Sequence, residues 1–348
     1  MNEPVSIIIL NYNGKKYLKD CLSSVLRQSY SEFEIILFDN NSTDGSESFV
    51  RENFSDPRIR IITSNVNLGF AGGNNEALKY TNNDLIVLLN NDTKVENDWL
   101  RYLVESVKDK NTIASSFVIT EGIDSRYYES NGSVSYLMYN IMNIFENREG
   151  EFYPNGCSLI FRKSEIPVPF DIDYFYYSED LYLGLKARFM GMKVIFVKES
   201  VVHHLGGGGY SLSRDKTFYQ ERNRLLNLFI FFSPLFILKV WPYVEFICDA
   251  KQFYSLFSQR ISFIGLTKAY LWLFFHIKTI FRKRKEVRQF FKIDEKEVIK
   301  YMTSKIVNHE NTFAKFLNSI SYYYSRLVGI KPIEYYQKHP NTNQLKKI

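Results

Sequence analysis

Two short stretches of the sequence carry residues suited to holding a divalent cation. Asn90-Asn91-Asp92 directly follows the apolar run 86–89, which places a carboxylate at the end of a predicted buried strand. Mg²⁺ and Mn²⁺ prefer oxygen ligands and often share them with a diphosphate. His203-His204 ends a β-branched run and precedes four glycines. Because imidazole binds Mn²⁺-like metals and glycine lets backbone approach a phosphate, the two stretches predict a metal site beside a phosphate group.

A third stretch, Glu179-Asp180, places two adjacent carboxylates at the start of a helical pattern that covers residues 178–190. Such a pair can cap the helix and complement its dipole. One member can instead serve as a general base that takes a proton from a reacting hydroxyl. The residues alone leave both interpretations open.

Strands and helices alternate through the first 112 residues. Continuous β-branched or apolar runs predict strands that are buried on both faces, whereas apolar residues three and four apart predict helices. The alternation indicates an α/β domain with a parallel sheet. The predicted strands are 5–10, 33–38, 59–62 and 84–89, and the predicted helices between them are 16–28, 46–52 and 72–80.

Polar residues follow each of these strands. In parallel α/β sheets, ligands bind at the carboxyl ends of the strands. A single Asn or Asp at such a position is commonly just a turn residue. The same chemistry at four consecutive strand ends favours a binding edge, formed by Asn11 and Asn13, Asp39 and Asn41, Asn67, and residues 90–92.

The later part of the chain has a different character. Residues 113–120 and 194–197 are predicted strands, several helices are predicted within 217–281, and a final helical stretch covers 294–328. Residues 206–209 form a glycine run, and the last twenty residues are predicted to be loosely ordered.

Charge is distributed unevenly along the 348 residues. Residues 221–348 hold 22 Lys and Arg against 9 Asp and Glu, whereas the first 220 residues are acidic. Aromatic helical stretches lie at 225–238 and 263–281, and Arg282-Lys283-Arg284-Lys285 follows the second. This pattern favours helices lying on an anionic membrane surface, although ordinary packing of these helices is the alternative. No nucleic-acid-binding motif accompanies the charge, so we expect no nucleic acid partner.

Three cysteines far apart in the sequence predict neither a disulfide framework nor a zinc knuckle, which fits a reducing compartment. The N-terminal residues lack the basic region of a signal peptide. We therefore expect a cytoplasmic protein, peripheral on the inner face of the cell membrane.

Seven motifs, in order along residues 4–228, resemble glycosyltransferase family 2, which has the GT-A fold. Within that family the chain is similar to the rhamnosyltransferase-like branch of cell-surface polysaccharide enzymes. The motifs are residues 5–14, 39–46, 67–75 and 88–93, the pair Glu179-Asp180, and residues 202–207 and 221–224.

The resemblance implies an inverting transfer of a sugar from a nucleotide-diphospho-sugar donor to a hydroxyl of a glycan or lipid-linked glycan, with Mg²⁺ or Mn²⁺. It implies Asp92 and His204, rather than His203, as metal ligands. It implies Asp180 as catalytic base, with Glu179 orienting or binding the acceptor. The implied donor-binding residues are Asn11, Asn13, Asp39, Asn41, Asn67, Gly69, Asn75, Asn90, Asn91 and Arg222.

The resemblance also implies an organisation: a GT-A catalytic domain over 1–220, with a Rossmann-like mixed sheet flanked by helices, and a helical basic region over 221–348. The donor-binding half would be 1–112 and the acceptor half 113–220. Asn90 and Tyr182 stand where many relatives have acids. A catalytically inactive glycan-binding or scaffold subunit is the alternative from another class. A dinucleotide-dependent dehydrogenase is excluded because residues 11–14 are no GxGxxG.

Overall fold

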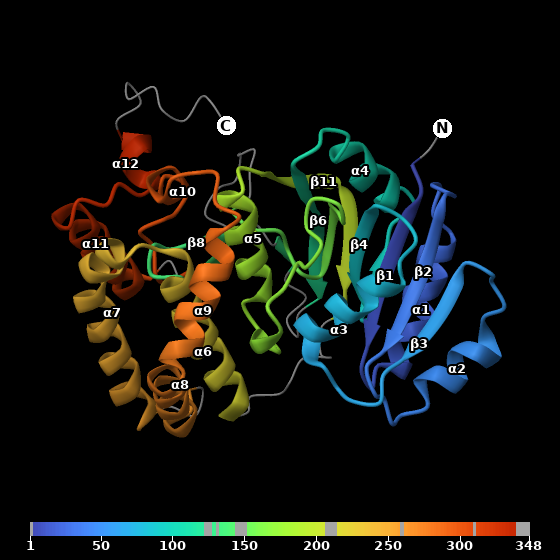
Figure 1. Ribbon diagram of the computed structural model, residues 1–348, viewed down its shortest axis with the longest axis horizontal. Coiled ribbons are helices and arrows are strands. Elements are labelled where there is room, and N and C mark those ends of the chain that lie inside the picture. Colours follow the sequence, from blue (N-terminus) through green and yellow to red (C-terminus); the bar gives the residue numbers. More distant parts are fainter. Residues whose placement is uncertain are drawn as a thin grey trace. The chain divides into compact units, whose positions relative to one another are not determined.

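A computed structural model describes residues 3–121, 127–129, 132–142, 152–205, 214–257, 261–308 and 311–338. The predicted glycine run at 206–209 and the final ten residues lie outside this part of the chain. The chain forms two compact units, whose secondary structure Figure 1 labels. The first unit comprises residues 1–131, 148–183 and 194–209, and the second comprises 132–147, 184–193 and 210–348.

Four parallel strands form one side of the sheet in the first unit, in the order β3-β2-β1-β4. Their registers pair Asn11 with Asp39 and Leu10 with Asn90, so the polar strand ends lie at one edge of the sheet. The predicted parallel strands are thereby confirmed. The strands are β1 (Val5–Asn11), β2 (Phe33–Asp39), β3 (Ile59–Thr63) and β4 (Leu85–Asn90).

β10, β6, β11 and β5 complete the sheet beyond β4 in that order. β10 runs antiparallel to both β4 and β6, and β11 runs antiparallel to β5, which makes the sheet the mixed one expected for the fold class. The predicted strand at 194–197 is much longer than expected and runs on to His204. β5 and β10 were not predicted. These strands are β5 (Thr93–Val95), β6 (Thr112–Glu121), β10 (Ser158–Arg162) and β11 (Lys193–His204), with β7 (Tyr127–Glu129) paired to β6.

Helices flank this sheet. α3 begins at Gly69, three residues before the predicted start. The prediction missed this first turn because the segment 69–73 is glycine-rich and carries no helical apolar pattern. α4 was not predicted, although its buried residues at 99, 100, 103 and 104 have helical spacing. The elements are α1 (Lys15–Leu26), α2 (Ser46–Asn53), α3 (Gly69–Ala77), η1 (Leu78–Tyr80), α4 (Trp99–Ser106), η2 (Ile172–Tyr174) and α5 (Glu179–Phe189), which continues into the second unit.

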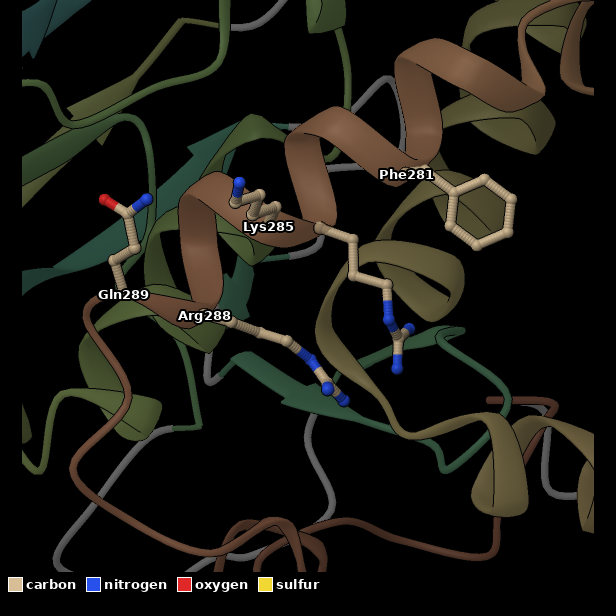
Figure 2. Close-up of a pocket in the computed structure, with 5 residues that line it drawn as sticks. Phe281, Lys285, Arg288 and Gln289 are labelled. Atoms are coloured by element: carbon tan, nitrogen blue, oxygen red, sulfur yellow. The ribbon is translucent and has the colours of Figure 1, made fainter.

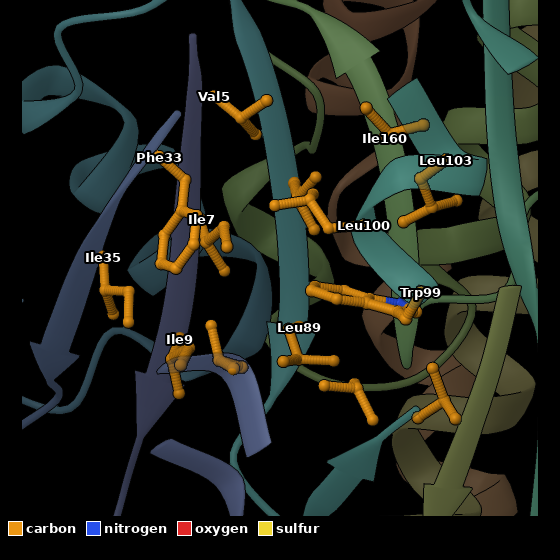
Figure 3. Packing of buried hydrophobic residues seen from close by; sticks show 14 of the residues in the cluster. Val5, Ile7, Ile9, Phe33, Ile35, Leu89, Trp99, Leu100, Leu103 and Ile160 are labelled. Carbon is orange, nitrogen blue, oxygen red and sulfur yellow. The ribbon is translucent and has the colours of Figure 1, made fainter. Parts of the chain in front are cut away.

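A core of apolar side chains between the sheet and α1 and α4 holds the strand ends in place. Figure 3 shows Val5, Ile7 and Ile9 of β1 projecting into the layer that also contains Trp99 of α4. The fully buried Trp99 Nε1 donates to Ser158 Oγ on β10 at 2.9 Å and to Ser116 Oγ on β6 at 3.0 Å. A buried indole N–H requires such partners, so these bonds fix α4 against the two strands.

The second unit is mainly helical, as predicted for this region, and α6 packs against α8 and α9. Within the described residues, no helix is both long and apolar enough to cross a membrane. One prediction was wrong: α12 lies within the last twenty residues, held by burial of Ile333 and Tyr336. The elements are β8 (Gly132–Val134), β9 (Asn140–Met142), α6 (Arg214–Phe231), α7 (Pro234–Ser255), α8 (Phe263–Phe275), α9 (Ile277–Arg288), α10 (Glu295–Ile299), α11 (Thr312–Leu327) and α12 (Ile333–Lys338).

Candidate active site

A hydrogen-bonded chain of side chains joins the ends of β1, β2 and β4. Asn11 is fully buried, and its Nδ2 donates to Asp39 Oδ2 at 3.2 Å and to Ser42 Oγ at 3.1 Å. Its Oδ1 accepts from Asn91 Nδ2 at 2.7 Å. Asp39 Oδ1 in turn accepts from the Ser42 backbone N–H at 2.7 Å. The structure therefore brings three predicted donor-binding residues together, and adds Ser42, which the sequence marked only as part of a motif.

The loops after β1 and β2 are locked to each other. Asn13 and Asn41 have φ of 50° and 69°, a left-handed conformation that Asn tolerates better than most residues. Asn13 N–H donates to Ser42 Oγ at 2.9 Å, and Asn13 Oδ1 accepts from Thr43 N–H at 2.8 Å. Asn41 is exposed. The two loops thus form one hydrogen-bonded rim, on which Asn13 and Asn41 are both exposed.

Asn40 extends this rim to the start of α3. Its Nδ2 donates to Asn67 Oδ1 at 3.0 Å and to the Gly69 carbonyl at 3.1 Å, while its Oδ1 accepts from Leu68 N–H at 2.9 Å. Every polar atom of this buried carboxamide is used. Asn40 therefore positions Asn67 and Gly69, two predicted donor contacts.

Gly69 and Asn75 connect α3 to the loop before α5. Gly69 has φ +69°, and a Cβ on it would lie 2.5 Å from the Phe175 carbonyl oxygen, so only glycine fits without strain. Phe70 N–H donates to that same carbonyl at 2.7 Å. Asn75 Nδ2 donates to the Phe170 carbonyl at 2.7 Å, and its Oδ1 accepts from Phe170 N–H at 3.2 Å. Asn75 thus ties α3 to the chain at Phe170. Its predicted contact with the donor stays a prediction.

The adjacent carboxylates Glu179 and Asp180 open α5 after a strained loop. Phe175, Tyr177 and Ser178 have φ of 53°, 70° and 61°, which is uncommon for residues with side chains and typically marks functional sites. A Cβ on Gly156 would lie 3.5 Å from Asp180 Cβ.

The residue after Gly156 ties this region to the end of β4, because the Cys157 carbonyl accepts from Asn90 N–H at 2.9 Å. Residues 156 and 157 therefore connect the two regions: Gly156 lies beside Asp180, and Cys157 is bonded to Asn90. Gly156 was missed in the sequence, where nothing distinguishes it from other turn glycines.

The environment of these two carboxyls favours their neutral forms. Burial raises the pKa of Glu179 above its ordinary value, and the negative charge of Asp180 adds to the rise. Glu179 Oε2 is shielded from solvent and has no hydrogen-bond partner, although the residue as a whole is partly exposed. Burial also raises the pKa of Asp180, but the Leu181 N–H bond to Oδ1 at 2.7 Å opposes that rise. Asp180 is therefore the first of the pair to ionise.

The structure brings Asp92 and His204 into contact. β5 and β11 pair antiparallel with Thr93 opposite His204, which places the ring Nε2 of His204 3.2 Å from Asp92 Oδ1. The Leu205 N–H also donates to the Asp92 carbonyl at 2.9 Å. His203 points elsewhere, since its Nε2 lies 2.8 Å from Glu96 Oε1. Of the two histidines, His204 is the one that meets Asp92, and its role as a metal ligand stays a prediction.

This pair fits a divalent cation only as part of a shared site. The Asp92 residue is 6% exposed, so its carboxylate is shielded, and a neighbouring imidazole supplies a nitrogen donor. No cluster of three or more His, Cys, Asp or Glu side chains suited to a metal occurs in the described part of the chain. The remaining ligands would have to come from a bound diphosphate or from water.

Arg222 belongs to the second unit, on α6. It is buried, with its guanidinium carbon 5.0 Å from the ring centres of Phe218 and Tyr219 and 4.9 Å from that of Trp272. Cation–π contacts of this kind stabilise helix packing. The predicted contact between Arg222 and the donor stays a prediction.

Comparisons with known proteins find glycosyltransferases. Residues 6–166 match the model of glycosyl transferase family 2. Glycosyltransferase GlyA of Streptococcus pneumoniae is 24% identical over 58% of this chain and 30% of its own length. The UDP-Glc:alpha-D-GlcNAc-diphosphoundecaprenol beta-1,3-glucosyltransferase WfgD of Escherichia coli is 40% identical over 25% of this chain and 34% of its own length. The chain thus spans about a third of the length of each relative.

A solved structure carries the same fold. The crystal structure of GalNAc-T7 with UDP, GalNAc and Mn2+ superposes with a TM-score of 0.57 at 15% sequence identity, covering 78% of this chain and 57% of that one. The mixed sheet with its polar strand ends at one edge, the family match and this likeness all indicate a glycosyltransferase. Residues 6–166 carry the similarity to glycosyl transferase family 2, and the fold of the chain is the GT-A fold.

Proposed function

We propose that the chain is an inverting, metal-dependent glycosyltransferase that moves a sugar from a nucleotide-diphospho-sugar to a hydroxyl of a lipid-linked glycan. The process would be cell-surface polysaccharide synthesis, for which relatives such as the putative teichuronic acid biosynthesis glycosyltransferase TuaG of Bacillus subtilis are named. The specific form that we propose is a hexosyl- or rhamnosyltransferase-like activity, after the branch that the sequence motifs resemble.

The contact between Asp92 and His204 is the observation that carries the proposal. A shielded carboxylate and an imidazole 3.2 Å apart, next to the polar strand ends, make a pair of donors suited to Mn²⁺ or Mg²⁺. When bound there, the cation would stabilise the negative charge that develops on the departing diphosphate. A scaffold protein that only bound glycans would not need these two side chains to meet.

Asp180 is the proposed base. The acceptor hydroxyl gives its proton to the Asp180 carboxylate while its oxygen bonds to the anomeric carbon of the donor sugar. The bond between that carbon and the diphosphate oxygen breaks, and the nucleoside diphosphate leaves with the electron pair. A single displacement of this kind inverts the anomeric configuration. Glu179, neutral beside it, can donate a hydrogen bond to the acceptor.

The rim built around Asn11 and Asn40 is the proposed donor edge. Asp39 and the exposed Asn41 would contact the base and ribose of the nucleotide, while Asn67 and Gly69 lie along its length. Because these residues are fixed by hydrogen bonds to one another, little of the binding free energy is lost in ordering them.

The proposed location of the protein is the inner face of the cell membrane. Phe274, Phe275 and Phe281 at the end of α8 and on α9 are 74%, 72% and 64% exposed, and basic residues follow them. Large exposed apolar side chains next to lysines and arginines are typical of helices that lie in a membrane interface. A lipid-linked acceptor would be reached from that position.

Asp180→Asn and Asp92→Asn together test the proposal. Thermal unfolding with Mn²⁺ is recorded across UDP-, GDP- and dTDP-sugars, because a donor present at 100 times its Kd stabilises the fold by about 2.7 kcal/mol. Asp180→Asn should keep the donor-induced rise in Tm and lose transfer by about 10²–10⁴-fold. Asp92→Asn should lose the Mn²⁺-dependent part of that rise.

Asp20→Asn, the same substitution on the exposed face of α1, is the matched control and should behave as the wild type. Near-normal turnover by Asp180→Asn would contradict the assignment of the base. If no nucleotide-sugar raised the Tm of the wild type, the inactive scaffold would be the better account of the fold.

A further inference from the structure

A basic hollow lies on α9 in the second unit. It has a volume of about 420 Å³ and is lined by Phe281, Arg284, Lys285, Arg288 and Gln289, whose side chains Figure 2 draws along one stretch of the helix. Three of these five side chains carry a positive charge at neutral pH, and none carries a negative one. The hollow thus gathers like charges, and Arg284 and Arg288, four residues apart on the helix, repel each other modestly.

Within the part of the chain that the structure describes, no carboxylate forms an ion pair with the cations of the hollow. Neither Lys285 nor Arg288 forms an ion pair within the described residues. Arg284 Nη1 donates to the Phe229 carbonyl at 2.6 Å, whereas its Nη2 is shielded and has no hydrogen-bond partner. Arg282, on the same helix but outside the hollow, does have a partner, with its Nε 3.7 Å from Glu286.

The surroundings of Arg284 disfavour its positive charge. Burial lowers the pKa of Arg284, and the neighbouring Arg288 lowers it further, while Glu295 acts in the opposite direction. The Glu295 carboxylate is itself occupied, because it accepts the Ser233 N–H at 2.7 Å and the Ser233 hydroxyl at 2.5 Å. An additional acceptor near Arg284 and Arg288 would relieve both the repulsion and the unpaired N–H groups.

The apolar side of the hollow indicates what carries the anion. Ile277, Phe281, Lys285 and Arg288 are three to four residues apart, so they follow one face of α9. Ile277 is 50% exposed and Phe281 is 64% exposed. One helix face therefore passes from exposed apolar side chains to cations. That order suits a molecule with an apolar body and an anionic head.

We propose that the hollow formed by Phe281, Arg284, Lys285 and Arg288 binds the phosphate group of an anionic lipid. The Arg288 guanidinium can bind phosphate oxygens through paired hydrogen bonds, and the Lys285 ammonium adds a point charge beside it. Phe281 and Ile277 would contact the acyl region beside that head group. This inference rests on the proposed membrane association and names the contact that orients the protein there.

Flotation with lipid vesicles tests the site on the full-length protein. The vesicles are phosphatidylcholine alone and phosphatidylcholine with phosphatidic acid. Lys285→Ala/Arg288→Ala is compared with Lys278→Ala/Arg282→Ala, which removes the same charge from exposed positions of α9 outside the hollow. At about 1 kcal/mol for each basic residue, the first variant should bind phosphatidic acid vesicles roughly 25-fold more weakly. The control should lose clearly less, because Lys278 and Arg282 lie outside the hollow.

Equal losses in the two double variants would overturn the site, because general surface charge would then explain binding. Inorganic phosphate is titrated as a separate arm. If it raised the Tm of the wild type as much as phosphatidic acid vesicles do, a lipid would no longer be the ligand. Transfer to a soluble glycan acceptor is measured in parallel. A wild type with no transfer contradicts the proposed function, whereas transfer without hollow-dependent vesicle binding contradicts only the lipid site.

Discussion

Replacing Glu179 and Asp180 separately by their amides tells which of the two carboxyls works as the base. The two side chains are adjacent, and both exchanges keep size and shape while removing one titrating group. Burial raises the pKa of each, and the charge of Asp180 raises that of Glu179 further. We therefore expect Glu179 to be protonated, and Asp180 ionised, in the working enzyme.

The size of each effect follows from this assignment. Glu179→Gln replaces a neutral carboxyl by a neutral amide, so its rate near neutral pH should stay within about tenfold of the wild type. Asp180→Asn removes the proton acceptor and should lower kcat by about 10²–10⁴-fold. An Asn at 180 can still accept the Leu181 N–H, so the start of α5 should remain folded.

The pH dependence gives an independent sign. The base works only when ionised, so kcat falls as the pH drops through the pKa of Asp180. Because burial raises that pKa, the acid limb of the wild type should have its midpoint above the ordinary Asp value of about 3.9. Single-turnover rates with saturating donor, recorded from acid to neutral pH, measure it without interference from product release.

Two results would refute this reasoning. One is an acid limb with its midpoint at or below about 3.9, which would mean that the environment of Asp180 does not disfavour its charge. The other is a reversed order, in which Glu179→Gln is the slower variant. In that case Glu179 would be the base and Asp180 the residue that positions the acceptor.

The remaining predictions concern a buried ion pair and one glycine. Glu221→Gln should lower the free energy of unfolding in urea by about 3–5 kcal/mol, because the buried Arg224, 2.6 Å away, and Lys251, 2.7 Å away, lose their partner. Glu47→Gln, at an exposed pair, should have little effect, and equal losses would contradict the argument. Burial alone would raise the pKa of Glu221, but its cationic partners hold that pKa well below the ordinary value. The extra stability of the wild type over Glu221→Gln is therefore complete above a pH of about 4.3 and falls as the solution becomes more acidic. Gly69→Ala should lower the free energy of unfolding in urea by about 1–3 kcal/mol and should also slow sugar transfer. If both the stability and the transfer rate were unchanged, the loop before α5 would have to move freely to make room for the new methyl group.

The parallel half of the sheet was predictable because each of its strands has a recognisable pattern within a few consecutive residues. β1, β2 and β4 are buried on both faces, and this burial requires continuous apolar runs that stand out in the sequence. Their polar ends were equally visible, since parallel strands place their carboxyl ends at one edge. Asn11, Asp39 and Asn91 do meet there.

The loop before α5 could not be predicted for a physical reason. Phe175, Tyr177 and Ser178 adopt left-handed conformations that residues with side chains normally avoid, so their types give no signal of the turn. The turn exists because neighbours compensate for it: the Phe175 carbonyl accepts from Phe70, and Gly69 leaves room for the ring. These contacts are more than a hundred residues apart in the chain, beyond the reach of any local pattern.

The meeting of Asp92 and His204 depends on a similar long-range arrangement. β5 has only three residues, too few to show a strand period, and yet it sets the register that puts His204 opposite Thr93. Four residues before His204, Ser200 Oγ donates to the Trp99 carbonyl at 3.0 Å and lies 2.9 Å from Ser116 Oγ.

Serine in a sequence indicates a turn at least as often as a strand, so the role of this core network was hidden. Because the network joins α4, β6, β10 and β11, it helps to place β11, the strand that carries the proposed metal ligand His204. His204 would therefore respond to a change at Trp99 or Ser200 even though neither residue reaches the donor edge.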